Sequence, residues 1–584
     1  MDETSRRHFR LHDREPRLLL ESAILGVAGA LSAQAFQWLL RLSNRFFLTA
    51  IAGYQPPGAE YGPTHQVIGP HGLWLIPAVT TLGGLISGFL VYRFAPEAEG
   101  HGTDTAVDAF HRREGLIRPR VPPLKMLASA ITIGSGGSAG REGPIALITA
   151  GVGSVYAKLA HRTEEDRRLL LLAGMAAGLS AIFRTPMGTG VFAIEVLYGR
   201  MEFEVGALLY TMLASAVAYT LNGIFVGFRP LFRFPVIPTP RPGDFAAYAA
   251  LGVAAGVVGT ILPRVFYRTR DLFRKLPIPL WTKPAAGGLL LGLLALEVPQ
   301  VLGGGYGWIQ LAIDGQLALR LMAVLIFAKV AALALTVSSG GSGGVFAPSL
   351  YVGAMLGGTF AVLLHQPPAV FVVVGMAAVF GAAARVPVAT MLMVTEMAGG
   401  YHLLVPAGLA VMIAYLLQVR LSSPLRYRSL YEGQVPTVRD SPAHYLEHIQ
   451  IALNLLGRRN VPVTDKLGHL DLLWMLRSRV RFDLPGGREL TMGLIRDDSP
   501  IEGKTVGQLY QRLSQYDFEI ITIRRREHLI LPHSETVFKA NDRLVLITSP
   551  GSREPLAKLI SPVAVEHEGG VQVEASEPSR KGAL

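Results

Sequence analysis

The 584-residue chain has no cysteine and comparatively few charged side chains. Aspartate, glutamate, lysine and arginine make up 17% of its residues, whereas roughly a quarter is usual in soluble proteins. The absence of cysteine excludes disulfides and cysteine-ligated metals. The sequence also has no cluster of metal-ligand residues and no paired nucleophile and base. It therefore gives no indication of an enzyme, and we expect no cofactor and no metal ion.

What the chain has in abundance is apolar sequence. Half of its residues are hydrophobic, and its mean hydropathy is +0.36. Runs of about 20 apolar residues, long enough to cross a bilayer, begin at Leu18, Leu73, Ala207, Phe245, Leu319 and Leu403. The 64 glycines are typical of helices that pack closely in lipid. The sequence therefore predicts an all-α polytopic membrane protein in contact with lipid.

The net charge of +12 comes largely from basic residues gathered in short loops, such as residues 111–120 and 267–275. Loops of this kind face the cytoplasm in membrane proteins, so we expect no nucleic-acid partner. The polar N-terminus is too long for a cleavable signal peptide. We expect a multi-pass protein of a cell membrane, the inner membrane of a prokaryote, with both termini in the cytoplasm.

The composition changes near Gln418, where the apolar region ends. We expect five parts: a cytosolic N-terminal segment at 1–17, a membrane domain at 18–426, a linker with helical segments at 427–489, a small α/β cytosolic domain at 490–562 and a disordered tail at 563–584. In the α/β domain, EIITIRR and RLVLITS alternate as strands do, and the sequence at Lys504–Leu513 favours a short helix.

The membrane domain contains an internal repeat. SGGSAGREGP (Ser135–Pro144) aligns without a gap with SGGSGGVFAP (Ser339–Pro348). A second match, of 174–196 with 375–397, aligns Arg184 with Arg385, Pro186 with Pro387, and Glu195 with Glu396. We therefore expect two related halves, at about 18–227 and 245–426. The paired arginines and glutamates favour a structural role that ties the repeat helices together, with a role in transport as the alternative.

Each repeat carries its glycine-rich segment inside apolar sequence. Neither segment has the context of a dinucleotide site or the Lys-Ser/Thr of a P-loop. Transporters built from repeats break their helices near the bilayer midplane, and the free amides and helix dipole at a broken end attract an anion. Pro144 and Pro348 suit a first helical turn. The two segments therefore predict helix starts that converge on one anion site.

A carboxylate lies in the first of these segments. Among amides that attract anions, the Glu142 side chain would occupy the anion's place. Protonation would release it, because the neutral form is held less strongly. Ionisable residues inside a membrane are candidates for function. The alternative is a surface ion pair between Glu142 and Arg141 at a helix end.

The motifs GREGP (Gly140–Pro144) and GVFAP (Gly344–Pro348) resemble signatures of the ClC family of chloride channels and proton-coupled chloride exchangers. The resemblance covers the membrane domain. It implies a ClC-type inverted repeat of tilted and broken helices, a homodimer, and a separate chloride pathway in each subunit. It also implies that Glu142 is the gate. The anion site it implies includes Gly140, Arg141, Gly143, Val345, Phe346 and Ala347.

The first anion-binding motif departs from the family pattern. Where the family has Gly-Ser-Gly-Ile-Pro, this chain has Gly100, His101, Gly102, Thr103 and Asp104. We expect the first four of these residues at the anion site. His101 either donates a hydrogen bond to the anion, or it packs and leaves the backbone to bind. A protonated histidine would favour anion access at low pH.

The pore tyrosine that the family carries after its last span is also displaced. In SSPLRYRSLYEG, the alignment puts Arg426 or Tyr427 at that position. We favour Tyr427 as the residue that lines the pore. Tyr431 is expected to be a packing aromatic.

A third departure concerns proton coupling. Exchangers of the family carry a second glutamate on the intracellular proton route, and Val196 occupies that position in this chain. Valine cannot accept a proton, which favours channel-like or weakly proton-coupled chloride conduction. The alternatives are a chloride/proton antiporter and, in a different class, a cation transporter regulated by the C-terminal domain.

The C-terminal domain resembles the C-terminal subdomain of regulators of potassium conductance, the TrkA-C type. The resemblance lies in Gly503-Lys504-Thr505, in Asn541-Asp542 and in the strands beside them. It implies a small module that dimerises and binds an unknown ligand or ion. A passive dimerising or folding appendage is the alternative.

Overall fold

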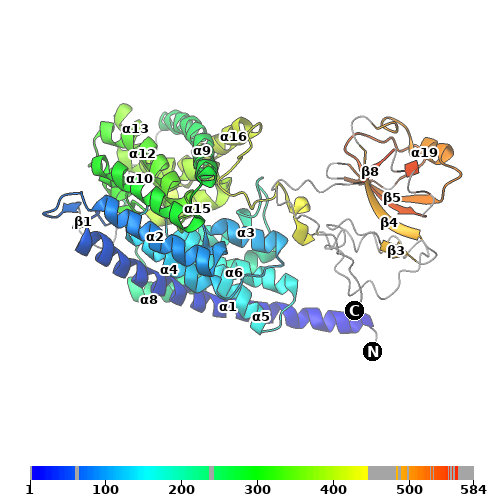
Figure 1. Cartoon of the computed structure of the whole chain (residues 1–584), viewed down its shortest axis with the longest axis horizontal. Coiled ribbons are helices and arrows are strands. Elements are labelled where there is room, and N and C mark those ends of the chain that lie inside the picture. Colours follow the sequence, from blue (N-terminus) through cyan, green and yellow to red (C-terminus); the bar gives the residue numbers. More distant parts are fainter. Residues whose placement is uncertain are drawn as a thin grey trace, which may run out of the picture. The chain divides into compact units, whose positions relative to one another are not determined.

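The computed structural model of the chain describes residues 3–58, 65–235, 242–444, 482–484, 488–495, 499–525, 528–530, 532–549, 552, 555–556 and 559–562. These residues belong to two compact units, which divide between Ala443 and His444 (Figure 1). The helical pieces predicted for the linker and the predicted disordered tail lie outside the described residues.

The first unit is built from helices. Within the described residues, seven helical segments are long and apolar enough to cross a membrane, which confirms the predicted all-α polytopic fold. The first helix already begins at Glu3, inside the predicted N-terminal segment. The main helices are α1 (Glu3–Asn44), α2 (Ile76–Phe94), α3 (Thr103–Arg112), α4 (Val121–Gly134), α5 (Glu142–Leu159), α6 (Glu164–Phe183), α7 (Pro186–Glu195), α8 (Leu208–Val226), α9 (Asp244–Lys275), α10 (Lys283–Glu297), α11 (Tyr306–Ile313), α12 (Leu319–Val337), α13 (Phe346–Leu363), α14 (Pro368–Ala384), α15 (Pro387–Ala398) and α16 (Leu404–Ser422).

The repeat seen in the sequence has the same helix breaks in both halves. Figure 1 shows the first half in blue to cyan beside the second in green to yellow. Helices α6 and α14 end at Arg184 and Arg385, which take left-handed conformations with φ of 60° and 58°. Pro186 and Pro387 then begin α7 and α15, where a missing N–H costs nothing. Sequence and backbone therefore repeat together.

The two repeats hold each other through a reciprocal pair of glutamates. The Glu195 carboxylate accepts hydrogen bonds from the amides of Val388 and Ala389 at the start of α15 (3.1 and 2.6 Å). The Glu396 carboxylate does the same at the start of α7 (3.2 and 2.8 Å). A carboxylate at a helix start satisfies free amides and complements the helix dipole. This geometry agrees with the structural role predicted for the paired glutamates.

The chain after α16 returns to the first unit. In this segment (residues 427–443), the amide of Leu430 donates to the carbonyl of Ala383 (2.9 Å), and the carbonyl of Val435 accepts from the amide of Gly199 (2.8 Å). The first unit therefore extends past the boundary predicted at 426, because these backbone groups pair with both repeats and not with solvent.

The second unit is a small α/β module. Its described elements are β3 (Phe482–Leu484), β4 (Arg488–Leu494), α19 (Val506–Arg512), β5 (Phe518–Arg525), β6 (His528–Ile530), β7 (Arg543–Thr548) and β8 (Ser561–Pro562). The strands pair in the order β3-β4-β7-β5-β6, antiparallel throughout, and β8 pairs with β4. Thr505 begins α19 with a capping box to Gln508, so the predicted short helix is confirmed.

One ion pair joins the end of β5 to the turn before β7. Arg525 on β5 contacts the fully buried carboxylate of Asp542 at 2.8 Å. The hydrogen bonds from the guanidinium to Asp542 raise the pKa of Arg525. Asp542 also accepts from the amide of Lys539 (2.9 Å). The Asn541-Asp542 motif of the sequence therefore serves as a buried anchor for the turn before β7.

The glutamate pair gives a test of how the repeats are held. Replacing Glu195 by glutamine removes the charge and one of the two acceptor oxygens, so we expect a loss of about 1–3 kcal/mol and unfolding at a lower temperature. Glu396→Gln should act in the same direction. The measurement is thermal unfolding in detergent, followed by intrinsic fluorescence. The exposed Glu297→Gln is the control, and equal unfolding temperatures for all three variants would contradict the assignment.

Candidate functional site

The two glycine-rich segments meet inside the first unit. Gly140 and Gly344, which are equivalent residues of the two repeats, exchange backbone hydrogen bonds of 2.7 Å in both directions. Helix α5 begins two residues later at Glu142, and α13 begins two residues later at Phe346. The helix starts therefore converge, as the repeat predicts.

Two buried lysines fix the turns before helices α3 and α11. The ammonium of Lys125 donates to the carbonyls of Ala98 and Gly100 (3.0 and 2.7 Å). The ammonium of Lys329 donates in the same way to the carbonyls before α11 (2.7 and 2.6 Å). Sequence analysis did not identify this pair. The spacing from Lys125 to Lys329 equals that from Glu142 to Phe346. This equal spacing is the sequence feature from which the lysine pair could have been predicted.

A small cavity of about 10 Å³ lies at the convergence. That volume is close to the smallest that holds a water molecule, ~10–15 Å³. Its walls come from both repeats and from the 427–443 segment. The lining residues are Thr103, Glu142, Gly143, Leu179, Phe183, Phe192, Val345, Phe346, Met393 and Tyr431.

The carboxylate of Glu142 is inside the protein, 1% exposed. Its Oε1 accepts a hydrogen bond from the hydroxyl of Tyr306, the first residue of α11. Its Oε2 lies 3.4 Å from the amide of Ala347, at the start of α13. The burial of the carboxylate excludes the alternative of a surface ion pair. Sequence analysis missed Tyr306, because no motif links it to the gate segment.

Arg141 lies beside this contact and outside the cavity. Its guanidinium is 4.9 Å from the ring centroid of Tyr306, a distance at which a cation is attracted by an aromatic face. The guanidinium therefore helps to orient the tyrosine that contacts Glu142. Arg141 was expected at the anion site, but it is not among the residues that line the cavity.

Tyr431, and not Tyr427, reaches the cavity. Tyr431 is 2% exposed and lines it with Glu142. Tyr427 stacks on Tyr267 with 4.7 Å between ring centroids and donates to Asp271 (2.6 Å). The expectation for Tyr427 is therefore corrected. Tyr427 packs against α9, and the tyrosine four residues later lines the cavity.

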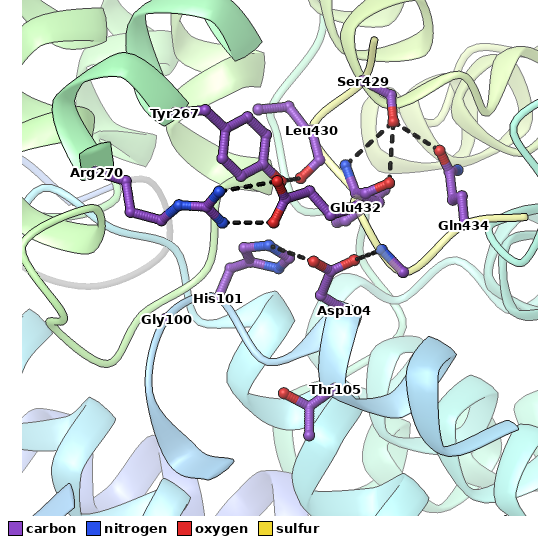
Figure 2. A network of polar contacts seen from close by, with 12 residues as sticks. Gly100, His101, Asp104, Thr105, Tyr267, Arg270, Ser429, Leu430, Glu432 and Gln434 are labelled. Carbon is purple, nitrogen blue, oxygen red and sulfur yellow. Dashed lines mark hydrogen bonds and ion pairs between the residues drawn. The ribbon is translucent and has the colours of Figure 1, made fainter. Parts of the chain in front are cut away.

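A polar network around Ser429 and Glu432 (Figure 2) holds the backbone on both sides of Tyr431. Arg270 on α9 makes a two-pronged ion pair with Glu432 (2.5 and 2.8 Å). The hydroxyl of Ser429 donates to Oε1 of Gln434 (2.8 Å), accepts from the amide of Tyr431 (3.3 Å) and lies 3.1 Å from the carbonyl oxygen of Tyr431. These contacts fix the main chain while they leave the Tyr431 side chain free to face the cavity.

The motif before α3 surrounds the cavity from a second side. Gly100 and Gly102 take positive φ of 69° and 87°, which glycine adopts without strain. Thr103 lines the cavity, whereas His101 is 6% exposed and packs on Tyr431, with ring centroids 5.4 Å apart. Of the two expectations for His101, packing agrees with this geometry.

Some of the remaining expected site residues line the cavity, and others lie beside it. Gly143, Val345 and Phe346 line the cavity, whereas Gly140 pairs with Gly344 and the amide of Ala347 lies 3.4 Å from the Glu142 carboxylate. Val196 is fully buried, and its carbonyl accepts from Gln434 (3.1 Å). Its side chain therefore presents no group that takes a proton.

Paired helix starts that converge on a buried carboxylate, in a repeated membrane fold, are typical of proteins that move anions across a membrane. Residues 83–418, more than half of the chain, match the family described as voltage gated chloride channel. The chain belongs to this family, the ClC family, and is a multi-pass membrane protein of ClC-type anion transport. Residues 494–561 match the TrkA-C domain, which confirms both resemblances seen in the sequence.

Some relatives are described as chloride channels and others as proton/chloride exchangers. The putative chloride channel protein ClcB-like of Ralstonia nicotianae is 29% identical over 441 residues, 73% of this chain and 99% of that protein. The H(+)/Cl(-) exchange transporter ClcA of Salmonella agona is 31% identical over 358 residues, 59% of this chain and 76% of that protein. The relatives alone therefore do not decide between conduction and exchange.

Solved structures show the same fold. A slow cyanobacterial Cl-/H+ antiporter superposes with a TM-score of 0.62 at 21% identity, covering 75% of this chain and 98% of that one. A CLC-type fluoride/proton antiporter superposes with a TM-score of 0.60 at 25% identity, covering 72% and 98%.

The placement of the two tyrosines can be tested with matched variants. Tyr431→Phe removes a hydroxyl from the cavity side, so we expect a change in chloride binding of about 0.5–1.5 kcal/mol. Tyr427→Phe removes the contacts of a hydroxyl outside the cavity, with Asp271 and Arg270, and should leave binding unchanged. Titration calorimetry with chloride in detergent measures both. A larger effect of Tyr427→Phe would contradict the placement.

Proposed function

We propose that the protein conducts chloride through the cavity where α5 and α13 begin, with Glu142 as the gate. The observation that carries the proposal is the position of the Glu142 carboxylate. It is held by the Tyr306 hydroxyl and lies near the Ala347 amide, which are donors that an anion would use. The carboxylate and a chloride ion therefore compete for one place, and the carboxylate keeps the pathway closed.

Tyr306 acts in this proposal as the latch of the gate. A hydrogen bond to an ionised group is among the stronger ones in proteins, and this one joins a helix start to the side chain that must move. Protonation of Glu142 removes its charge and weakens the bond. The gate then opens by rotation of one side chain, while the helix starts stay in place.

Channel-like conduction with at most weak proton coupling is the first candidate mechanism. It is supported by Val196, whose side chain cannot carry a proton on the route that the family's exchangers use. A chloride/proton antiporter is the second candidate, supported by the exchange transporters among the relatives. Family membership leaves the cation-transport alternative without support.

The orientation and assembly follow from the same proposal. The ends of α3 and α9 carry the basic residues of 111–120 and 267–275, which favours a cytoplasmic position for that face. The 427–443 segment lies at this face, because Arg112 and Arg270 both contact it. We therefore place both termini in the cytoplasm of a prokaryotic cell and propose a homodimer with one pathway in each subunit.

Chloride efflux from liposomes tests the gate. Glu142→Gln mimics the protonated gate, so we expect faster efflux that no longer changes with pH. Proton movement is recorded beside chloride in the same vesicles. Absence of uphill proton movement in the unmodified protein supports conduction, and stoichiometric uphill movement would establish the antiporter. Efflux of Glu142→Gln equal to that of the unmodified protein at every pH would remove Glu142 from the gate.

The latch is tested by Tyr306→Phe, which deletes one hydroxyl. The lost bond is of the order of 1.5 kcal/mol or more, about tenfold in the ratio of closed to open gate, so efflux should rise. In a Glu142→Ala background the same change should have no effect. Tyr351→Phe, at a buried tyrosine outside the cavity, is the control. An equal effect of Tyr306→Phe with and without Glu142 would contradict the latch.

A further inference from the structure

The side chains of Asp104 and His101 lie next to each other between the solvent-exposed surface and the wall of the cavity. Asp104 Oδ2 lies 3.7 Å from Nε2 of His101 (Figure 2). The side chain of Asp104 is 25% exposed, whereas that of His101 is 7% exposed. One end of the pair is therefore accessible to water, and the other is buried against Tyr431, a residue of the cavity wall.

We propose that Asp104 and His101 form a proton-transfer pair that delivers protons to Glu142 from the face carrying Arg112 and Arg270. The proposal rests on the assignment of Glu142 as the gate and adds the route by which the gate becomes protonated. In this chain the carboxylate that takes the proton is Asp104, at the start of α3. At the position where the family's exchangers carry a glutamate for this purpose, the chain has the apolar Val196.

The second nitrogen of the imidazole is the one that is not paired with Asp104. Nδ1 of His101 is buried and has no hydrogen-bond partner among the described residues. A buried polar atom without a partner is costly, so this nitrogen indicates a partner that comes and goes. A histidine ring accepts a proton at one nitrogen and releases one from the other, which suits such a position.

The transfer changes only O–H and N–H bonds. Water at the surface protonates the Asp104 carboxylate, which then gives its proton to Nε2 of His101. The ring, now protonated on both nitrogens, releases the Nδ1 proton toward the cavity, where the Glu142 carboxylate takes it. When the gate closes, Glu142 returns its proton to Nδ1 and Nε2 returns its proton to Asp104, so each step is reversed and the ring regains its first tautomer. No oxidant, reductant or metal is required.

The cations near the pair are engaged elsewhere. Lys125 donates to two backbone carbonyls, and Arg270 is paired with Glu432. Within the described residues, His101 is the basic group paired with Asp104, so no fixed cation holds this carboxylate ionised. The charged and titratable groups that face the pair are Lys125 on α4, Asp108 and Arg112 on α3, Tyr267 and Arg270 on α9, and Tyr431 and Glu432 on the 427–443 segment.

Asp104 also has a structural contact that an experiment must preserve. Its Oδ1 accepts a hydrogen bond from the amide of Gly433 (2.7 Å), which tethers the segment that carries Tyr431. Asparagine keeps an acceptor oxygen of the same size at this place and cannot be protonated in the same range. Asp104→Asn therefore removes proton transfer and keeps the hydrogen bond that tethers Gly433.

The experiment records chloride current through the full-length protein in planar bilayers while the pH is lowered on one face at a time. We expect the unmodified protein to respond to acid on both faces or on the Asp104 face alone. Asp104→Asn and His101→Gln should lose most of the response to acid on the Asp104 face. Asp108→Asn, one turn further along α3 and paired with Arg112, should respond as the unmodified protein does.

A double variant decides whether the pair acts through the gate. Because Glu142→Gln needs no proton, Asp104→Asn in that background should conduct as Glu142→Gln alone. A low current in the double variant would assign Asp104 a structural role and overturn the inference, and so would an unchanged acid response of Asp104→Asn. If Glu142→Gln itself leaves current and pH response unchanged, the gate assignment fails, which is a separate result.

Discussion

The structure depends on the two hydrogen bonds that join Gly140 to Gly344. Each residue donates to and accepts from its counterpart in the other repeat, so the local twofold relation of the halves passes through this contact. A Cβ on Gly344 would lie 2.8 Å from the amide nitrogen of Gly143 and 2.9 Å from the Gly140 carbonyl oxygen. Only glycine permits this approach, and the positions of α5, α13 and the cavity follow from it.

Buried charged side chains around that contact also occur in pairs, with one member in each repeat. Two lysines hold the carbonyls before α3 and α11, and two glutamates hold the amides at the starts of α7 and α15. Water is scarce at this depth, so each broken helix end needs a partner from the protein. The repeat supplies one partner from each half. This explains how irregular backbone persists beside apolar helices without leaving its polar groups unpaired.

The sequence predicts the parts of the site that lie in continuous motifs. Glu142 could be placed because a glycine segment before a helix start has a defined chemistry, and Phe346 because GVFAP resembles a signature of the family. Tyr306 could not, since it lies 164 residues from Glu142 and meets it only when the repeats close. The tyrosine after α16 shows the same limit. The sequence gives its neighbourhood, but the turn that selects Tyr431 over Tyr427 is set by hydrogen bonds to Arg270, Ala383 and Asp104 in three other elements.

The size of the cavity bears on how an ion passes. At about 10 Å³ it has room for roughly one water molecule, so the described pathway is closed by side chains. The backbone around it is fixed by the glycine contact and by the lysines, and it offers no hinge there. Tyr431 packs on His101, and Glu142 is held by Tyr306, so the Glu142 side chain is the cavity group that a change of its charge can release. In the proposed mechanism, opening therefore needs a rotamer change of Glu142 and no rearrangement of helices, and protonation of that carboxylate is the signal that releases it.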